Sequence, residues 1–268
     1  MNFRTFALVG AVAGVASLGL SQASAVPIDF DDASQPAYAD GWLDGTDGST
    51  NPDGLGSWVF GGNAPGNTVI ASSVGNGGGG DGDGDIDSDG VAFGLLDSGD
   101  FVDVFRFIDP ADLQVGQALV MDIDVNFRGG FKGVRVRGAD DDTSNPIFRF
   151  EIGNPGTGDD YIVYDALTGN GSVGNAYAAD TQFRLELTQT TADAGTWTLT
   201  RSGSITDSDS GTYAGVVSSF QLYSVGSNSA TEGNAEQAIY FNNFAIVPEP
   251  AAGAGLGLLG LAVRRRHR

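Results

Sequence analysis

The chain has 268 residues, no cysteine and a formal net charge of −21. Residues 26–250 contain all 34 acidic residues but only eight of the 13 basic ones, so this region has a net charge of −26. Such an acidic surface repels a phosphate backbone and excludes nucleic-acid binding. The absence of cysteine excludes disulfides. The one histidine, His267, is the penultimate residue, which excludes Ser-His-Asp and Cys-His catalysis in the preceding region.

The first 25 residues predict a secretory signal peptide. Arg4 supplies a short basic region, residues 6–20 are apolar, and Ala23-Ser24-Ala25 fits the small-residue cleavage site. A buried N-terminal helix is the alternative, but the order of charge, apolar run and cleavage site favours export, with removal of this helix after Ala25. We expect residues 26–247 to form one domain with a sizeable core.

Alternating apolar residues indicate strands throughout residues 26–247, and helical periodicity is nearly absent. In residues 119–127, for example, every second residue is apolar. The other segments expected to be strands are 28–30, 58–60, 68–72, 91–96, 101–107, 148–152, 161–164, 183–187, 197–201, 215–225 and 238–247. This pattern predicts an all-β fold, an antiparallel β-sandwich or jelly roll, flanked by the signal helix and a short C-terminal hydrophobic helix. We also expect the first and last strands to pair.

A hairpin is predicted around Gly129-Gly130, because both central positions of a type I′ turn need a positive φ. Its register places Asp124 opposite Arg135 on the solvent side, with a second acid–base pair two residues away. Five of the eight basic residues of the domain lie close together in this part of the sequence: Arg128, Lys132, Arg135, Arg137 and Arg149. Such a stripe could bind an anionic polysaccharide, but we interpret it as a charge-paired, solvent-facing strand.

An acidic, glycine-rich stretch, residues 76–90, is a candidate calcium site. Asp85, Asp87 and Asp89, followed by glycine, match the start of an EF-hand-type loop, in which alternate carboxylates converge on one cation. The match then ends, since the twelfth position is Leu96 instead of a bidentate glutamate, and no flanking helix is predicted. The alternative is a flexible acidic loop of low complexity.

Trp42 is the candidate ligand-binding residue, because an exposed indole can stack on a sugar ring. It lies in a second stretch rich in Asp and Gly, outside the alternating segments. The alternative is burial in the core, which we also expect for Trp58 and Trp197.

The sequence contains no recognisable catalytic pair. Glycoside hydrolysis requires two carboxylates across a cleft. The five glutamates do not form the Glu-x-Asp-x-x-Glu strand pattern of laminarinase-like sandwiches. We therefore predict that the protein is not an enzyme. The alternative is a carbohydrate-active hydrolase or lyase that uses paired Asp and Glu, because aspartates are plentiful.

Residues 248–268 have three parts: the motif Pro248-Glu249-Pro250, an apolar run, and a cluster formed by Arg264, Arg265 and Arg266. This order resembles the PEP-CTERM sorting signal of exported bacterial proteins. The resemblance implies transient anchoring in the inner membrane by the short hydrophobic helix and recognition of the Pro-Glu-Pro motif by an exosortase. It also implies delivery to the cell surface, often in bacteria that make exopolysaccharide. Under the positive-inside rule, the arginines stay cytoplasmic.

These observations predict an exported protein of the cell envelope or extracellular matrix with a structural or adhesive role. Carbohydrate, including exopolysaccharide, and calcium are its candidate ligands, and no other cofactor is expected.

Overall fold

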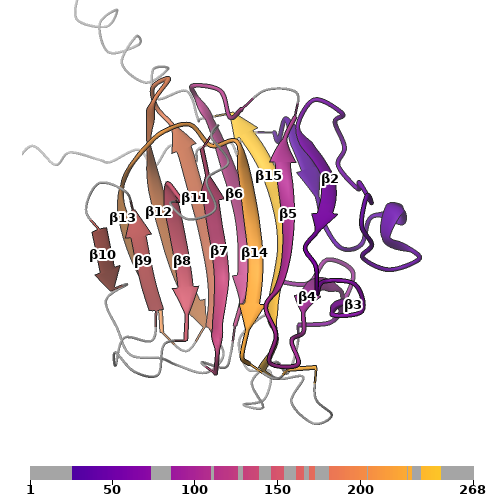
Figure 1. Ribbon diagram of the computed structural model, residues 1–268. Helices are drawn as coiled ribbons and strands as arrows, with labels where there is room; N and C mark the ends of the chain where they lie inside the picture. The colour runs from indigo at the N-terminus through magenta and orange to yellow at the C-terminus, as the bar shows by residue number, and fades with distance from the viewer. Residues whose placement is uncertain are drawn as a thin grey trace, which may run out of the picture.

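Two antiparallel sheets lie one behind the other in the computed structural model of the chain (Figure 1). The structure describes residues 26–73, 86–109, 112–125, 129–138, 146–153, 161–165, 169–172, 181–203, 205–227, 229–230 and 237–248. Within these ranges no helix is long and apolar enough to span a membrane. Both predicted terminal helices lie outside the described residues.

The first sheet has eight strands: β13 (Asp207–Ala214), β12 (Ala194–Gly203), β11 (Thr181–Gln189), β6 (Gln117–Asp124), β15 (Ile239–Pro248), β4 (Ala92–Leu95) and β3 (Thr68–Ala71) in spatial order, with β1 (Asp29–Asp31) also paired to β15. The second sheet has seven, in the order β10 (Gly169–Ser172), β9 (Tyr161–Asp165), β8 (Phe148–Ile152), β7 (Phe131–Arg137), β14 (Ser219–Val225), β5 (Val102–Ile108) and β2 (Leu55–Phe60). A short 3-10 helix, Pro36–Tyr38, precedes β2. The predicted all-β sandwich is confirmed.

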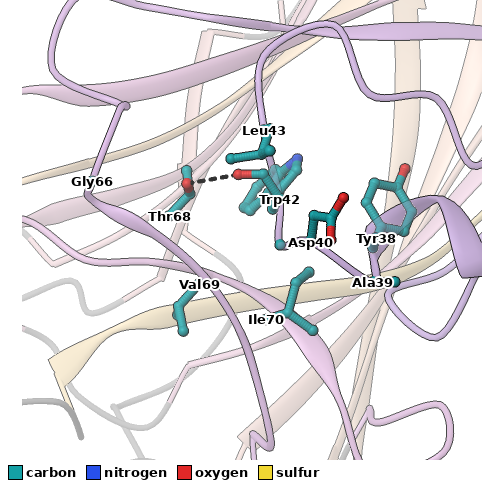
Figure 2. A pocket seen from close by; sticks show the side chains of 10 residues that line it. Tyr38, Ala39, Asp40, Trp42, Leu43, Gly66, Thr68, Val69 and Ile70 are labelled. Atoms are coloured by element: carbon teal, nitrogen blue, oxygen red, sulfur yellow. Dashed lines mark hydrogen bonds between the residues drawn. The ribbon is translucent and has the colours of Figure 1, made fainter.

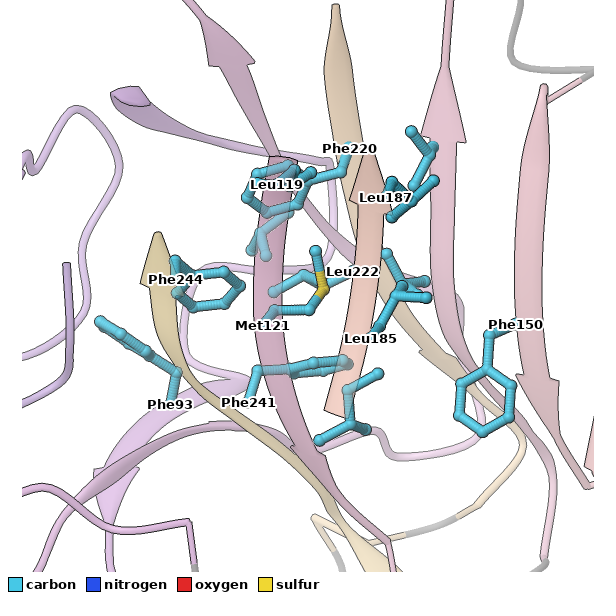
Figure 3. Close-up of a cluster of buried hydrophobic side chains, with 14 of the residues drawn as sticks. Phe93, Leu119, Met121, Phe150, Leu185, Leu187, Phe220, Leu222, Phe241 and Phe244 are labelled. Carbon is cyan, nitrogen blue, oxygen red and sulfur yellow. The ribbon is translucent and has the colours of Figure 1, made fainter. Parts of the chain in front are cut away.

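The core fills the space between the two sheets (Figure 3). Successive side chains of a strand point to opposite faces, so alternation places one apolar row of each strand inside. Leu119 and Met121 of β6 in this way meet Phe220 and Leu222 of β14, and all four are buried. The strands predicted from alternation at 148–152, 183–187 and 197–201 are therefore present with the expected face inward, as is the predicted strand 119–127 up to Asp124; Asn126 and Phe127 lie outside the described residues.

The predicted pairing of the first and last strands is confirmed. β1 runs antiparallel to β15, with Asp29 opposite Ile246. The Asp29 carboxylate is buried and accepts hydrogen bonds from the backbone amides of Asn51 (2.9 Å) and Leu55 (2.6 Å). The beginning of the domain is therefore fixed to the sheet at one side and to the segment before β2 at the other.

The predicted hairpin at Gly129-Gly130 is wrong. β6 lies in the first sheet, between β11 and β15, whereas β7 lies in the second sheet, between β14 and β8. The connection crosses from one sheet to the other, so Asp124 and Arg135 are not partners. The register argument failed because alternation specifies which face of a strand is apolar but not which strand lies beside it.

Candidate functional site

We call the outer face of the second sheet the arginine face. It carries charged, amide and aromatic side chains that contact one another. Lys132, Val134 and Val136 of β7 point into the sandwich, so Arg135 and Arg137 point outward. The pairing registers place Arg149 of β8 beside Arg135 and Gln221 of β14 on its other side. Residues directly opposite each other share a face, so these side chains form one row across three strands.

Arginine side chains on this face lie over aromatic rings. The guanidinium carbon of Arg135 is 4.2 Å from the centre of the Tyr223 ring, and that of Arg149 is 3.7 Å from the Tyr164 ring. Phe101 stacks on Tyr223 with ring centres 6.1 Å apart. These contacts are cation–π and stacking interactions, which hold a flexible side chain in one place while leaving its charge intact.

Glu151 is hydrogen-bonded to the same cluster of side chains, and the contact passes over Gly133. The Tyr223 hydroxyl donates a 2.7 Å hydrogen bond to the Glu151 carboxylate, and Gly133 lies between the two residues in the register. A Cβ at Gly133 would lie 2.0 Å from the carbonyl oxygen of Phe150, so the backbone admits only glycine there. Burial, and then the nearby carboxylate, raise the pKa of Tyr223 well above its ordinary value, so the hydroxyl remains a donor at neutral pH.

A second buried chain of hydrogen bonds crosses the middle of the arginine face. The Gln221 side chain donates to the Asp103 carboxylate (2.6 Å) and accepts from the Arg137 guanidinium (2.9 Å). Burial raises the pKa of Asp103, while the Gln221 hydrogen bond and Arg137 act in the opposite direction. All three side chains are buried, so this network is fixed before any ligand arrives.

The two carboxylates of the arginine face are far apart. Glu151 lies on β8 and Asp103 on β5, with β7 and β14 between them. At about 4.8 Å per strand their strands are roughly 14 Å apart, beyond the separations of about 5–9.5 Å found in glycosidases. Glu151 and Asp103 are therefore not a glycosidase pair.

Aromatic side chains are exposed at the margins of this surface. Among the described residues, the three exposed phenylalanines are Phe101 (37%), Phe107 (40%) and Phe131 (39%). Phe107 and Phe131 occupy outward positions of β5 and β7, and Phe101 stacks on Tyr223. All three therefore belong to the arginine face, which combines exposed rings with ordered polar groups.

The basic stripe that the sequence indicated is only partly solvent-facing, contrary to our expectation. Lys132 points into the sandwich and is fully buried, Arg137 is buried, and Arg135 and Arg149 face each other; Arg128 lies outside the described residues. The aspartate that we expected opposite Arg137, Asp122, instead forms a 3.0 Å ion pair with Arg184 on the first sheet. Sequence reasoning did not identify Tyr164, Gln221 and Tyr223, because their roles depend on strand order.

A depression of about 520 Å³ lies between the segment 38–43 and β3 (Figure 2). Trp42 contributes to its wall, but its side chain is only 2% exposed and packs edge to face on Trp58 (5.0 Å) and Phe60 (5.9 Å). The prediction that Trp42 offers its ring to a sugar is therefore wrong. The Thr68 hydroxyl donates to the Trp42 carbonyl, and Asp40 is the acidic residue among those that line the depression.

The calcium prediction stays a prediction. Asp85 lies outside the described residues. Asp87 accepts hydrogen bonds from the Ser72 hydroxyl (2.6 Å) and the Ser73 amide (2.8 Å). Asp89 and Gly90 have positive φ angles of 50° and 81°, and form a two-residue turn closed by hydrogen bonds between Ser88 and Val91. Among the described residues, no group of three or more acidic, histidine or cysteine side chains could hold a metal.

The sorting-signal residues are almost entirely outside the described part of the chain. Pro248 is the last residue of β15, opposite Gln117 of β6. Glu249, Pro250, Arg264, Arg265 and Arg266 lie outside the described residues.

No protein-family model matches the chain, and no curated protein matches it. Several solved structures are similar to it. The catalytic domain of a glycoside hydrolase family 131 protein from Coprinopsis cinerea is 10% identical, with a TM-score of 0.43, over 72% of this chain and 84% of that one. A marine alginate lyase from Aplysia kurodai is 14% identical, with a TM-score of 0.38, over 62% and 86%. A Bacillus subtilis protein of unknown function with a galectin-like fold is 11% identical, with a TM-score of 0.37, over 62% and 87%.

These similarities correct one expectation. We predicted that the protein is not an enzyme, but the structures similar to it include a glycoside hydrolase domain and an alginate lyase. The lack of a sequence signature therefore did not exclude catalysis. At these identities and TM-scores the likeness assigns no ligand or reaction to this chain.

Proposed function

We propose that this protein binds carbohydrate on the arginine face. The observation that supports this most directly is the position of the three exposed phenylalanines, all on one sheet face beside ordered arginine, glutamine and tyrosine side chains. Phe101 and Phe131 lie near one end of this face and Phe107 near the other, and exposed apolar groups that share a face indicate an interaction surface. A sugar ring has an apolar face that packs on such rings and hydroxyls that need fixed polar partners.

A glycan array on the purified protein tests this proposal. Phe107→Ala and Phe131→Ala should weaken binding of the glycan that the unaltered protein retains. Ile205→Ala is the matched control, because Ile205 is exposed to a similar degree, 37%, but lies between β12 and β13 of the first sheet. Binding to no glycan, or equal loss in the control, would refute the proposal.

We further propose that the protein reaches the cell envelope or extracellular matrix through its two ends. The predicted signal helix starts export, and the short C-terminal helix holds the chain in the inner membrane until an exosortase processes Pro248-Glu249-Pro250. The position of the motif supports this route, because it follows the last strand directly. Mass spectrometry of the surface-located protein tests it: an intact Arg268 on most molecules would contradict processing.

A further inference from the structure

We infer that the carbohydrate recognised on the arginine face is acidic, and that a carboxylate or sulfate of the polymer sits between Arg135 and Arg149. This inference rests on the proposed function and adds the chemical class of the ligand. The observation behind it is the direct opposition of these two arginines across β7 and β8. Like charges that face each other across a ladder destabilise a sheet. An anion bound between them replaces that repulsion with two attractions.

The donors of both guanidinium groups are available. Each guanidinium carbon lies over a tyrosine ring, and arginines that stack on rings keep their in-plane N–H groups for other partners. Arg135 donates no hydrogen bond to any described residue. The Arg149 side chain is 25% exposed, so a ligand can approach it from solvent. An oxyanion with two acceptor oxygens side by side, such as a carboxylate or a sulfate, fits such forked donors.

The nearest carboxylate does not fill this role. Glu151 is 3.7 Å from the Arg149 guanidinium, beyond hydrogen-bond distance, and its carboxylate already accepts the Tyr223 hydroxyl. Arg135 forms no ion pair within the described part of the chain. The two arginines are therefore held in place by neighbours that leave most of their hydrogen-bonding capacity unused.

The negative charge of the rest of the domain limits the distance over which the two arginines can attract an anion. Residues 26–250 carry a net charge of −26, so a polyanion approaching from a distance is repelled. At physiological salt that repulsion is screened beyond about 8 Å, whereas the contacts at the two arginines are made at hydrogen-bond distance. The surface should therefore select acidic groups by direct contact, and should bind polymers of low charge density better than densely charged ones.

The test compares polymers that differ in charge alone. Polygalacturonate that keeps only a small fraction of free carboxylates is measured against its fully methyl-esterified form, and lightly sulfated dextran against dextran, by calorimetry in about 0.15 M salt. The intact protein should bind the acidic member of at least one pair roughly tenfold or more tightly, as expected for bidentate arginine contacts. The pair that shows the preference identifies the oxyanion as carboxylate or sulfate.

Substitutions then assign the preference to the two arginines. Arg135→Gln and Arg149→Gln should each remove it, whereas Arg149→Lys, which keeps the charge but loses the fork, should retain part of it. Arg184→Gln, on the outer face of the first sheet, is the control and should change nothing. Melting curves confirm that each variant is folded.

Two outcomes separate this inference from the proposed function. Binding of neutral and acidic members with equal affinity, in a manner that depends on the phenylalanines, would overturn the acidic ligand and leave carbohydrate binding intact. A preference for the acidic polymer that persists in the Arg135→Gln/Arg149→Gln double variant would also overturn it. Binding of no glycan at all would refute the proposed function itself.

Discussion

The two outer faces of the sandwich are built from different residues, although both surround the same core. On the first sheet, Thr196, Thr198 and Thr200 are exposed along β12, and Arg184 of the neighbouring strand forms an exposed ion pair with Asp122. On the second sheet, the arginine face carries stacked guanidinium groups, buried hydrogen bonds and exposed phenylalanines. Around β12 the first face is an ordinary hydrated surface, whereas beside β15 it is covered, and Asn242, Val120 and Ala245 are buried there.

This difference shows that the side chains of the arginine face are more ordered than the folding of a sheet face requires. A hydrated sheet face folds with threonines and exposed ion pairs that contribute little. On the arginine face, Tyr223 is 0% exposed and Gln221 3% exposed, although both point away from the core. Side chains packed against each other on an outer surface hold their positions before binding, which lowers the entropy lost when a ligand arrives.

Truncating one side chain on each outer face to alanine should give the largest difference in the free energy of unfolding. Tyr223→Ala removes a buried ring, its stack with Phe101 and its hydrogen bond to Glu151. We expect a loss of about 3–5 kcal/mol in the free energy of unfolding, as for other buried aromatic residues. Thr198→Ala on the other face should change it by less than about 0.5 kcal/mol. Urea denaturation measures both, and similar losses would show that the faces are equivalent.

A change of pH extends the comparison to the inner side of the second sheet. Burial lowers the pKa of Lys132 to about 7, and its ammonium group donates to the Gln237 carbonyl. Between pH 7 and about 10 the unfolded chain then holds a proton that the folded protein has released, so stability rises with pH. Relative to Lys132→Met, the unaltered protein should gain up to about 1.4 kcal/mol per pH unit in this range.

Denaturation of both proteins at pH 7, 8 and 9 checks this prediction. The variant removes the titrating group, so its own curve provides the control for every other ionisation. If the difference in stability between the two proteins were independent of pH, Lys132 would titrate normally in the folded state.

Removing one carboxylate from each face should give a smaller contrast. Glu151→Gln replaces a charged acceptor of the Tyr223 hydroxyl by a neutral one, which we expect to lower stability by about 1–2 kcal/mol. Glu186→Gln, on β11 of the first sheet, should be nearly neutral, because Glu186 accepts only a long 3.5 Å hydrogen bond from Thr188. If the two substitutions lowered the melting temperature equally, the Tyr223–Glu151 hydrogen bond would be no stronger than the Thr188–Glu186 one.

The smallest effect is expected for the exposed ion pair. Arg184→Gln breaks its contact with Asp122, which is 3.0 Å long and open to solvent, and should cost no more than about 0.5 kcal/mol. The loss should shrink further in 1 M salt, where such pairs are screened. A cost above about 2 kcal/mol in urea denaturation would show that the first face is more organised than its side chains suggest.

Much of the fold could be predicted because alternation reports burial directly. The strands at 119–127 and 183–187 follow from their apolar rows, and the pairing of the first and last strands was also predicted correctly. β13, with the sequence DSDSGTYA, was missed because it is an edge strand with few apolar residues. An edge strand with little to bury has no period-2 signal to detect.

The candidate site was only partly predictable. The arginines of β7 and β8 stood out in the sequence as a basic stripe, but their partners come from β9, the next strand, and from β5 and β14, which are far away in the chain. Two strands with the same alternation can pair equally well, so the wrong hairpin also assigned the wrong partners to the arginines. Trp42 shows the converse error, since a tryptophan in a loop-like stretch is buried under neighbouring aromatic rings.

The position of β15 has a mechanical consequence. This strand is hydrogen-bonded to β6, β4 and β1, all antiparallel, and it ends at Pro248, where the sorting motif begins. If the exported protein is tethered through its C-terminal end, a pull on a bound polymer is transmitted along the axis of β15. Such a force loads the three ladders in shear, with many hydrogen bonds resisting together, whereas a tether on an edge strand would let them open one by one.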